Sequence, residues 1–415
     1  MIKRRYHLVF LTLRPFFRLF MRLAYNYHAK PAPLLRPDQP ALILANHNAA
    51  FDPFFMAASF KRPIFFVASD HIFRLGWISS VIRALVSPIP IVKSQMDLRT
   101  LRTIRETIQS GGLVGLFPEG NRSFSGVTAH MMPSVGKLVR QLNCTLILYR
   151  IEGAYLATPR WSLKKRHGLI HGAVVRQMEP DELARLTPDE IYKVIVDTLH
   201  VDAFTDQLKN PIRFAGKRLA ENLELALFVC PKCHRMTTLL SEDDVFSCDC
   251  GLAVRYTTLG FFEPVDNWSQ AERQEGRFLD SVAAWDAWQR KMLVQLPGDS
   301  SIIDMSGGRA LFHDDDQRLY DCERASRSVQ IATGRLSLFS DRLEFQSDEG
   351  KLHKYPLIEI TRMIVHGPKT LQFATTQGTV LEVRSKARRS ALKYMMLYHL
   401  LEQIRKGEPH GFFGL

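Results

Sequence analysis

Between residues 41 and 176 the chain alternates short apolar runs with segments of helical periodicity, which limits its possible folds more than any other feature. One segment places Leu98, Leu101, Ile104 and Ile108 on a single helical face, with Gly111 as the predicted C-cap. Strands that alternate with helices predict an α/β fold with at least partly parallel strands. The runs that read as buried strands are ALILAN, PIFFVA, IPIVK, LVGLF and CTLILYRI, at residues 41–46, 63–68, 89–93, 113–117 and 144–151.

The pattern changes after this region. A helix with Thr187 as its N-cap is predicted first, followed by a second helix over roughly residues 214–227. A cysteine cluster, a Trp-bearing segment, alternating strands and a final helix around residues 386–406 complete the chain. We therefore predict five parts: an interface helix (1–30), an α/β domain (31–228), a cysteine ribbon (229–256), a helical connector (257–300) and a β-rich domain (301–415).

The net charge of +13 favours a polyanionic partner, either nucleic acid or an anionic membrane surface. Residues 1–40 contain eight basic residues and one acidic residue. Pro15 is predicted to open a helix there, with Arg14, Arg18 and Arg22 along one face and apolar side chains on the rest. This pattern is typical of an interfacial helix whose cations reach anionic lipid, although a helix covering the α/β domain with a solvated basic side fits it as well.

No run reaches the roughly 18 uncharged apolar residues that a membrane-spanning helix needs. The segment LVFLTL is too short for the apolar region of a signal peptide, and no small-residue cleavage site follows it. We therefore expect a peripheral protein at the cytoplasmic face of the cell membrane.

A histidine and an aspartate follow the first predicted strand. His47 comes two residues after the apolar run, at the carboxyl end of a strand, where open α/β sheets place their ligand sites. Asp52 lies five residues later, and Pro53 disfavours helical geometry at Asp52, so the carboxylate can fold back onto the imidazole. Such a pair can take a proton from an attacking hydroxyl. A purely structural hydrogen-bonded pair is the alternative.

A second loop follows the strand at residues 113–117. It contains Pro118, Glu119, Gly120, Arg122 and Ser123. The tight turn can direct backbone N–H groups at an anion, and a guanidinium suits phosphate. An ordinary loop with a solvated arginine is the alternative. Together, the two loops predict a site that activates a hydroxyl on a phosphorylated molecule.

These residues resemble the glycerolipid acyltransferases, the family of 1-acyl-glycerol-3-phosphate acyltransferase. NHNAAFDP is similar to their His-x4-Asp motif, and LFPEGNRS is similar to their Phe-Pro-Glu-Gly-Thr-Arg-Ser block, with Asn121 in place of the Thr. The resemblance covers residues 20–180, and in it Lys93 falls where the family has a basic residue after a strand. It implies an acyltransferase-type mixed sheet flanked by helices.

The resemblance also implies a reaction. His47 would take the proton of a glycerol hydroxyl as the oxygen attacks an acyl-CoA or acyl-carrier-protein thioester, and Asp52 would orient His47. Glu119, Gly120, Arg122 and Lys93 would bind the acceptor, a lysophospholipid of which 1-acyl-glycerol-3-phosphate is the expected example, in phospholipid biosynthesis. A non-catalytic lipid- or nucleic-acid-binding adaptor on the same scaffold is the alternative.

Four of the six cysteines form a Cys-x2-Cys-x14-Cys-x-Cys pattern at Cys230, Cys233, Cys248 and Cys250. This spacing predicts a structural zinc ribbon, and two disulfides are the alternative. Residues 230–251 contain two basic and four acidic residues, the wrong balance for a phosphate backbone, so we expect no nucleic acid partner.

The strands predicted between residues 300 and 385, followed by one amphipathic helix, look like a pleckstrin-homology or GRAM-type barrel. Basic residues gather near the start of that helix, where they fit either anionic headgroups or a solvated face: Arg384, Lys386, Arg388, Arg389 and Lys393.

Overall fold

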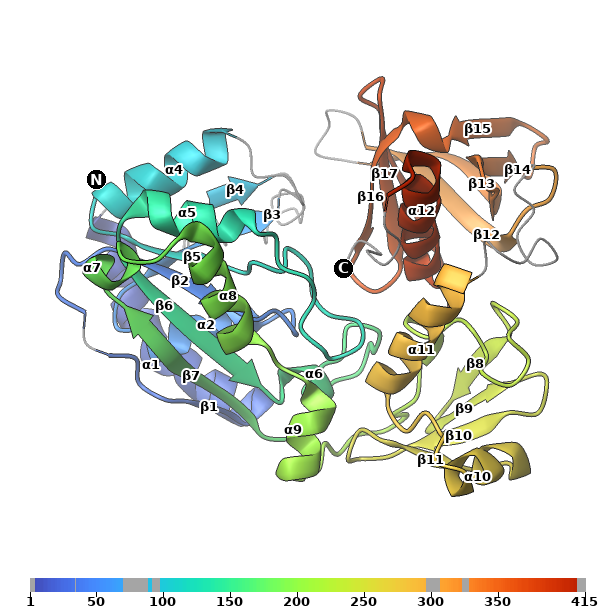
Figure 1. The fold of residues 1–415 in the computed structure, drawn as a ribbon, viewed down its shortest axis with the longest axis horizontal. Coiled ribbons are helices and arrows are strands. Elements are labelled where there is room, and N and C mark those ends of the chain that lie inside the picture. Colours follow the sequence, from blue (N-terminus) through green and yellow to red (C-terminus); the bar gives the residue numbers. More distant parts are fainter. Residues whose placement is uncertain are drawn as a thin grey trace. The chain divides into compact units, whose positions relative to one another are not determined.

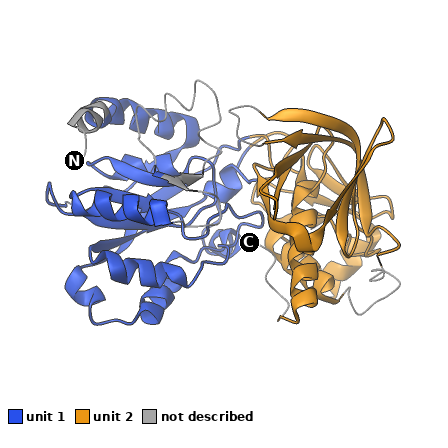
Figure 2. Ribbon diagram, turned by 90° about the horizontal axis from the view of Figure 1, so that it is seen from above, with its two compact units in different colours: residues 1–160, 165–215 blue, residues 161–164, 216–415 orange. Residues whose placement is uncertain are grey.

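The computed structural model describes residues 4–33, 35–69, 89–91, 98–295, 307–322 and 328–408. The chain forms two compact units, which Figure 2 shows in different colours. The first unit comprises residues 1–160 and 165–215, and the second comprises residues 161–164 and 216–415. Residues 216–228, which we assigned to the α/β domain from the sequence, therefore group with the cysteine ribbon and the β-rich domain.

A seven-stranded mixed sheet forms the centre of the first unit (Figure 1). Neighbouring strands from β6 to β4 are parallel, whereas β7 runs antiparallel to β6 and parallel to β1. All five strands predicted from the sequence are present, and β1 and β7 are additional. The strand order is β1 (Tyr27–Ala29), β7 (Ile170–Met178), β6 (Thr145–Glu152), β2 (Ala41–Ala45), β5 (Leu113–Leu116), β3 (Ile64–Ser69) and β4 (Ile89–Ile91).

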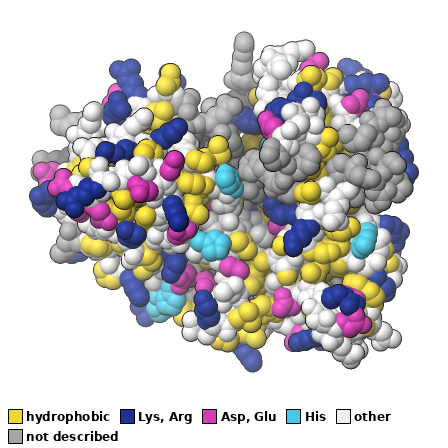
Figure 3. Space-filling view, viewed as in Figure 1, with side chains coloured by type: hydrophobic (Ala, Val, Ile, Leu, Met, Phe, Trp, Pro, Cys, Tyr) yellow, Lys and Arg dark blue, Asp and Glu magenta, His cyan; other side chains and the backbone are white. Residues whose placement is uncertain are grey.

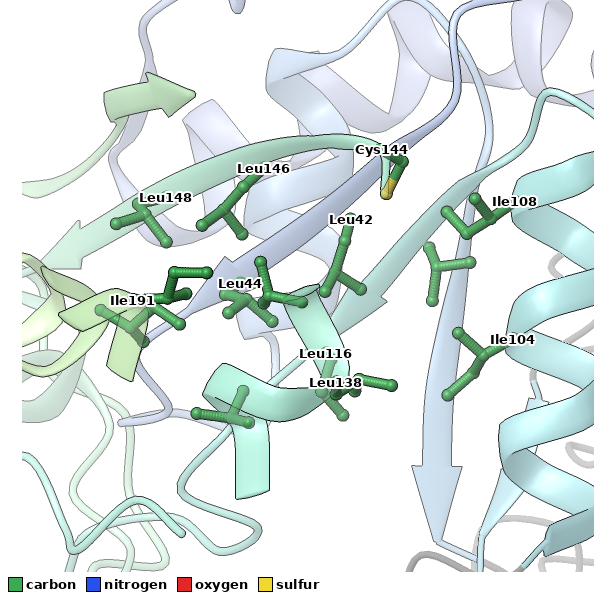
Figure 4. Packing of buried hydrophobic residues seen from close by; sticks show 14 of the residues in the cluster. Leu42, Leu44, Ile104, Ile108, Leu116, Leu138, Cys144, Leu146, Leu148 and Ile191 are labelled. Atoms are coloured by element: carbon green, nitrogen blue, oxygen red, sulfur yellow. The ribbon is translucent and has the colours of Figure 1, made fainter. Parts of the chain in front are cut away.

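Helices α4 (Leu98–Gln109), α5 (Ser134–Leu142) and α8 (Pro188–Leu199) pack against one face of this sheet. Figure 4 shows Ile104, Ile108, Leu138 and Ile191 from these helices in contact with the leucines of the strands. Leu98, predicted on the same stripe, is instead 85% exposed because it is the first residue of its helix. The approach of α5 to α8 requires Gly136, since a Cβ there would lie 2.1 Å from the carbonyl oxygen of Pro188.

Helix α1 (Arg4–Tyr25) begins before the predicted start and continues through Pro15, so this proline lies inside the helix instead of opening it. The helix packs on α2 (Asp52–Ser59), with the rings of Phe17 and Phe54 5.5 Å apart. Among the described residues, no helix is long and apolar enough to cross a membrane. A second stripe of α1 leaves large apolar side chains exposed, namely Leu11, Leu13, Phe16, Leu19, Phe20 and Leu23.

Thr187 is the N-cap of α8, as the sequence predicted, and it forms a capping box with Glu190. The predicted helix over residues 214–227 is wrong, because Arg218 and Asn222 adopt left-handed φ angles of 56° and 75° that interrupt a right-handed helix. Only a 3-10 turn forms there, at Leu223–Leu225. The first unit also contains the helices α6 (Ala154–Ala157), α7 (Pro180–Leu183) and α9 (Ala203–Lys209).

The second unit contains two antiparallel sheets. The smaller one consists of β8 (Leu239–Glu242), β9 (Val245–Cys248), β10 (Ala253–Tyr256) and β11 (Phe262–Pro264), and it is followed by α10 (Asn267–Gln274) and α11 (Val282–Gln295).

The larger sheet has seven strands, in the order β15-β14-β13-β12-β18-β17-β16, followed by α12 (Ala391–Lys406). Nearly all of α12 is buried from Ala391 to Leu401, so this helix fills the space beside the strands. The strands are β12 (Phe312–Asp321), β13 (Val329–Leu338), β14 (Arg342–Ser347), β15 (Leu352–Pro356), β16 (Ile360–His366), β17 (Thr370–Thr375) and β18 (Val380–Ser385).

The basic residues near the start of α12 mostly have partners within the second unit. Lys393 is buried against Asp314 at 2.8 Å, and Arg384 pairs with Glu382. Arg388 pairs with Glu221 at 3.0 Å, and Arg389 is buried beside Tyr394. These four basic groups therefore have partners within the unit, which favours a packing role over contact with a lipid surface. On the face shown in Figure 3, basic side chains are mixed with acidic and apolar ones and do not form a single basic patch.

Candidate active site

Two neighbouring parallel strands bring the predicted site residues together. β2 and β5 pair in parallel, so the segments after Ala45 and Leu116 leave the same edge of the sheet. Asn46 extends the pairing beyond β2, because its side-chain amide exchanges hydrogen bonds with the backbone of Ile151 at 2.8 and 2.9 Å. The ring of His47, one residue later, stacks on Phe117 from the other loop at 4.3 Å. The sheet thus places residues about 70 positions apart in direct contact.

Asp52 is fully buried and organises the first loop. Its Oδ2 atom accepts hydrogen bonds from the backbone N–H groups of Asn48 and Ala49, at 2.7 and 2.8 Å. The same oxygen lies 2.9 Å from Nδ1 of His47. The predicted pairing of histidine and aspartate is therefore present, with the carboxylate held by the turn that separates them.

This arrangement leaves one ring nitrogen of His47 able to act as a base. An ionised carboxylate only accepts hydrogen bonds, so Nδ1 carries the proton and Nε2 keeps its lone pair. Burial lowers the pKa of His47 from its ordinary value, as do the cations of Arg122 and Arg160, whereas the bond to Asp52 opposes this shift. The imidazole is thus neutral near pH 7, and 20% of its side-chain surface remains accessible.

Glu119 joins the two loops through the backbone. Its Oε1 accepts from the N–H of His47 at 2.6 Å, and its Oε2 accepts from the N–H of Ala129 at 2.8 Å. Burial raises the pKa of Glu119 to about 8, against the effect of these two donors. Because both oxygens already bond to backbone, this geometry favours a positioning role for Glu119 over the acceptor contact that we predicted.

Three backbone N–H groups of the second loop are bonded within the protein and are therefore not available to the predicted anion cradle. The N–H of Gly120 donates to the carbonyl of Phe117 at 3.0 Å, and the N–H of Ser123 donates to the carbonyl of His47 at 3.2 Å. The N–H of Arg122 bonds to the side chain of Asn121 at 3.1 Å. Gly120 is needed because its φ of +65° is unfavourable for other residues. An anion at this loop would therefore not be bound by the N–H groups of Gly120, Arg122 and Ser123.

Arg122 supplies such a side chain. Within the part of the chain that the structure describes, its guanidinium makes no hydrogen bond or ion pair. Burial lowers the pKa of Arg122, and the charge of Asp52 partly offsets this. Lys93, the other predicted phosphate-binding residue, lies outside the described residues.

Sequence reasoning missed a second arginine beside this loop. Arg160 is 3% exposed, and its Nη1 atom donates to the side chain of Asn121 and to the carbonyl of Arg122, both at 2.7 Å. It follows α6 and lies outside both motifs. The sequence shows only an arginine directly before a tryptophan, with no helical or strand periodicity to mark it.

The four cysteines predicted as metal ligands lie together in the second unit. Their sulfur atoms are all within 4.8 Å of one another. Two of the separations, Cys230 to Cys250 and Cys233 to Cys248, are 3.7 and 3.8 Å. A tetrahedral zinc ion with Zn–S bonds of about 2.3 Å separates its sulfurs by about 3.8 Å, whereas a disulfide requires about 2.05 Å. The geometry fits a tetrahedral metal site, and all six cysteines are free thiols in this structure.

One family model covers the part of the chain that contains both loops. Residues 26–151 match the family model described as Acyltransferase, which includes both loops. No curated protein matches the chain. Among solved structures, the chain is similar to the 1-acyl-sn-glycerophosphate (LPA) acyltransferase PlsC from Thermotoga maritima, with 18% identity and a TM-score of 0.39 over 51% of this chain and 84% of that chain.

The chain is also similar to the C-terminal domain of an unknown protein from Leishmania infantum, with 18% identity and a TM-score of 0.18. That match covers 23% of this chain and 89% of the other. We base the functional interpretation on the family model and on the geometry of the site, not on these two similarities.

Proposed function

Taking residues 26–151 as an acyltransferase domain, we propose that this protein transfers a fatty acyl group from a thioester to the free hydroxyl of a lysophospholipid. The observation that carries the proposal is the pairing of His47 with buried Asp52, beside the guanidinium of Arg122, which makes no hydrogen bond or ion pair to another described residue. 1-Acyl-glycerol-3-phosphate is the proposed acceptor, and acyl-CoA or acyl-carrier protein is the proposed donor.

The proposed reaction proceeds in one transfer without an acyl-enzyme. Nε2 of His47 accepts the hydroxyl proton while the acceptor oxygen attacks the thioester carbonyl. The carbon–sulfur bond then breaks, and the imidazolium returns its proton to the departing thiolate. Asp52 fixes the tautomer of His47 and stabilises the imidazolium. Phe117 stacks on the ring and restricts its orientation.

Arg122 binds the acceptor phosphate in this proposal. A guanidinium offers paired donors that match phosphate oxygens, and Arg122 lies close enough to His47 to influence the pKa of its ring. The acceptor hydroxyl and the base would thus be held together. Lys93 remains a proposed second phosphate ligand.

We place the protein at an anionic membrane surface, on its cytoplasmic face. The exposed apolar stripe of α1 supports this proposal, because Phe16 and Leu23 are 74% and 70% exposed although the opposite side of the helix packs on the domain. Arg18 and Arg22 are also exposed on this helix. Apolar side chains flanked by arginines suit the boundary between lipid headgroups and acyl chains.

The second unit is proposed to contain a structural zinc ion and a pleckstrin-homology or GRAM-like domain. The four thiolates fit zinc, which would hold the two cysteine turns together. The seven antiparallel strands and the buried helix α12 support the second assignment.

Acyl transfer by purified protein tests the proposal, with lipids formed from mixed thioester donors and candidate acceptors identified by mass spectrometry. We expect His47→Ala to abolish turnover while acceptor binding is retained, because the base is lost and the phosphate site remains. Arg122→Ala should raise the acceptor KM and lower kcat/KM. The exposed residue His200 provides a matched control, and His200→Ala should retain activity. Near-normal transfer by His47→Ala would refute the proposal.

A further inference from the structure

Arg160 is a buried cation attached to the loop that carries Arg122. One nitrogen, Nη1, donates to both Asn121 Oδ1 and the Arg122 carbonyl, and the guanidinium lies 4.0 Å from the ring centre of Phe124. Asn121 Oδ1 also accepts from the N–H of Arg122. A single amide oxygen therefore connects the two arginines.

We propose that Arg160 is a positioning residue of the acceptor site, which fixes the loop that carries Arg122 and adds a second positive charge that favours a doubly charged phosphomonoester headgroup. The inference rests on the proposed function, since it concerns the acceptor of the same site. It goes beyond that proposal by assigning a role to a residue outside both sequence motifs.

The loop itself supports the positioning role. Three of its N–H groups, those of Gly120, Arg122 and Ser123, already bond within the protein. These three N–H groups are not available to an anion, whereas the side chain of Arg122 is, and the placement of that side chain depends on the backbone at residues 121–122. Arg160 donates hydrogen bonds to the side chain of Asn121 and to the carbonyl of Arg122. Burying a guanidinium is costly, and two hydrogen bonds and a ring contact of Arg160 are made with this loop.

The charges around His47 support the electrostatic role. The described groups that face His47 are the carboxylate of Asp52, the carboxyl group of Glu119 and the guanidinium groups of Arg122 and Arg160. Arg160 is buried, so in this proposal it acts on the acceptor through its field, across protein of low polarity, and not by contact. A phosphomonoester carries up to two negative charges and a phosphodiester carries one, so the second cation attracts the former more strongly.

The test compares Arg160→Met and Arg160→Lys with Arg166→Met. Arg166 is a matched control because it is 4% exposed and donates to a backbone carbonyl, that of Leu156, yet is not among the charges that shift His47. Arg160→Met should raise the KM for a lysophosphatidic-acid acceptor by about tenfold, with a smaller change for a lysophosphatidylglycerol acceptor. Arg160→Lys should retain most of the wild-type value, because the charge is kept.

A second measurement does not depend on activity. The pKa of His47 can be followed by NMR of histidine-labelled protein, with the signal assigned by its loss in His47→Asn. Removing a nearby cation favours the imidazolium, so Arg160→Met should raise this pKa and Arg166→Met should leave it unchanged. The fall in kcat/KM on acidification should then begin at a higher pH, because only neutral His47 is a base.

Thermal melting of all three variants shows whether each one folds. If Arg160→Met is folded and leaves both the His47 pKa and the ratio of the two acceptor KM values unchanged, the inference is wrong. Equal shifts in Arg166→Met would also overturn it, since any buried arginine would then have the same effect. If the wild-type protein transfers no acyl group, the proposed function fails, whereas the NMR titration still decides whether Arg160 acts on His47.

Discussion

At the scale of single residues, the roles of two carboxyl groups in the candidate site depend on the hydrogen bonds that their oxygen atoms already accept. Asp52 and Glu119 are both buried, and both bond to the backbone near His47. Asp52 also reaches the imidazole ring, whereas Glu119 has each oxygen committed to a backbone N–H. The two carboxylates are therefore expected to act differently, one on the base and one on the shape of the loops.

Replacing Glu119 with Gln tests this distinction. One of the two N–H donors would lose its acceptor, which costs about 1–3 kcal/mol for a buried group. The loop that carries His47 should move, so we expect kcat to fall by more than the acceptor KM rises. Steady-state kinetics with varied acceptor measure both constants. A large rise in KM with kcat preserved would instead support the direct acceptor contact predicted from the sequence.

The same variant has a stability readout. The pKa of Glu119 is about 8 in the folded protein, above its ordinary value of 4.5. Between these two pH values the folded state binds a proton that the unfolded state does not, so its contribution to stability falls as the pH rises. Glu119→Gln should flatten the dependence of the unfolding free energy on pH over this interval, as measured by denaturant titration.

At the scale of elements, α1 has two different faces. One face carries Phe17 and Met21 toward the domain, and Lys165 sits over the ring of Tyr25 at the end of the helix, 4.7 Å from its centre. The other face leaves Phe16 and Leu23 exposed. Packing within the unit explains the first face and leaves the second without a protein partner among the described residues.

We predict that Phe16→Asp combined with Leu23→Asp weakens binding to anionic phospholipid vesicles by at least about tenfold, because two apolar side chains are lost from the lipid boundary. The melting temperature should change little, since both residues are exposed. Vesicle sedimentation measures the binding. Leu208→Asp, on another exposed leucine at 69%, is the control. Undiminished sedimentation of the double variant would contradict a role for this face.

At the scale of the whole chain, the residues just before Cys230 organise the second unit. Trp285 donates to the carbonyl of Val229 at 2.9 Å, and Gln289 donates to that of Ala226 at 2.9 Å. Ser390, the N-cap of α12, donates to the carbonyl of Leu225 at 3.0 Å. The residues just before Cys230 thus connect the cysteine ribbon, helix α11 and the β-rich domain.

Metal removal is therefore predicted to destabilise the second unit beyond the ribbon. The purified protein should contain about one zinc ion per chain, measured by elemental analysis, and a strong chelator should lower its melting temperature. Cys250→Ser should bind less zinc and show the same loss, whereas Cys322→Ser, a buried cysteine away from the cluster, should keep its zinc. A metal-free protein with unchanged melting would disprove a structural metal.

The sequence by itself determined the features that depend on local pattern. Apolar runs of strand length predicted five strands of the first sheet, Thr187 marked a helix start, and the spacing of the four cysteines indicated a metal site. The spacing of His47 and Asp52 predicted their contact because a short turn allows few other arrangements. Each of these signals acts over a few residues, so neighbouring side chains are enough to reveal it.

Only the tertiary structure decided how distant segments combine. The predicted helix at 214–227 is interrupted by the left-handed residues Arg218 and Asn222, and Pro15 lies within a helix that packs against α2. The N–H groups near Gly120 bond within the protein, which no local pattern shows. Arg160 joins the site because β2, β5 and β6 lie side by side, and this pairing depends on the free energy of packing the whole sheet.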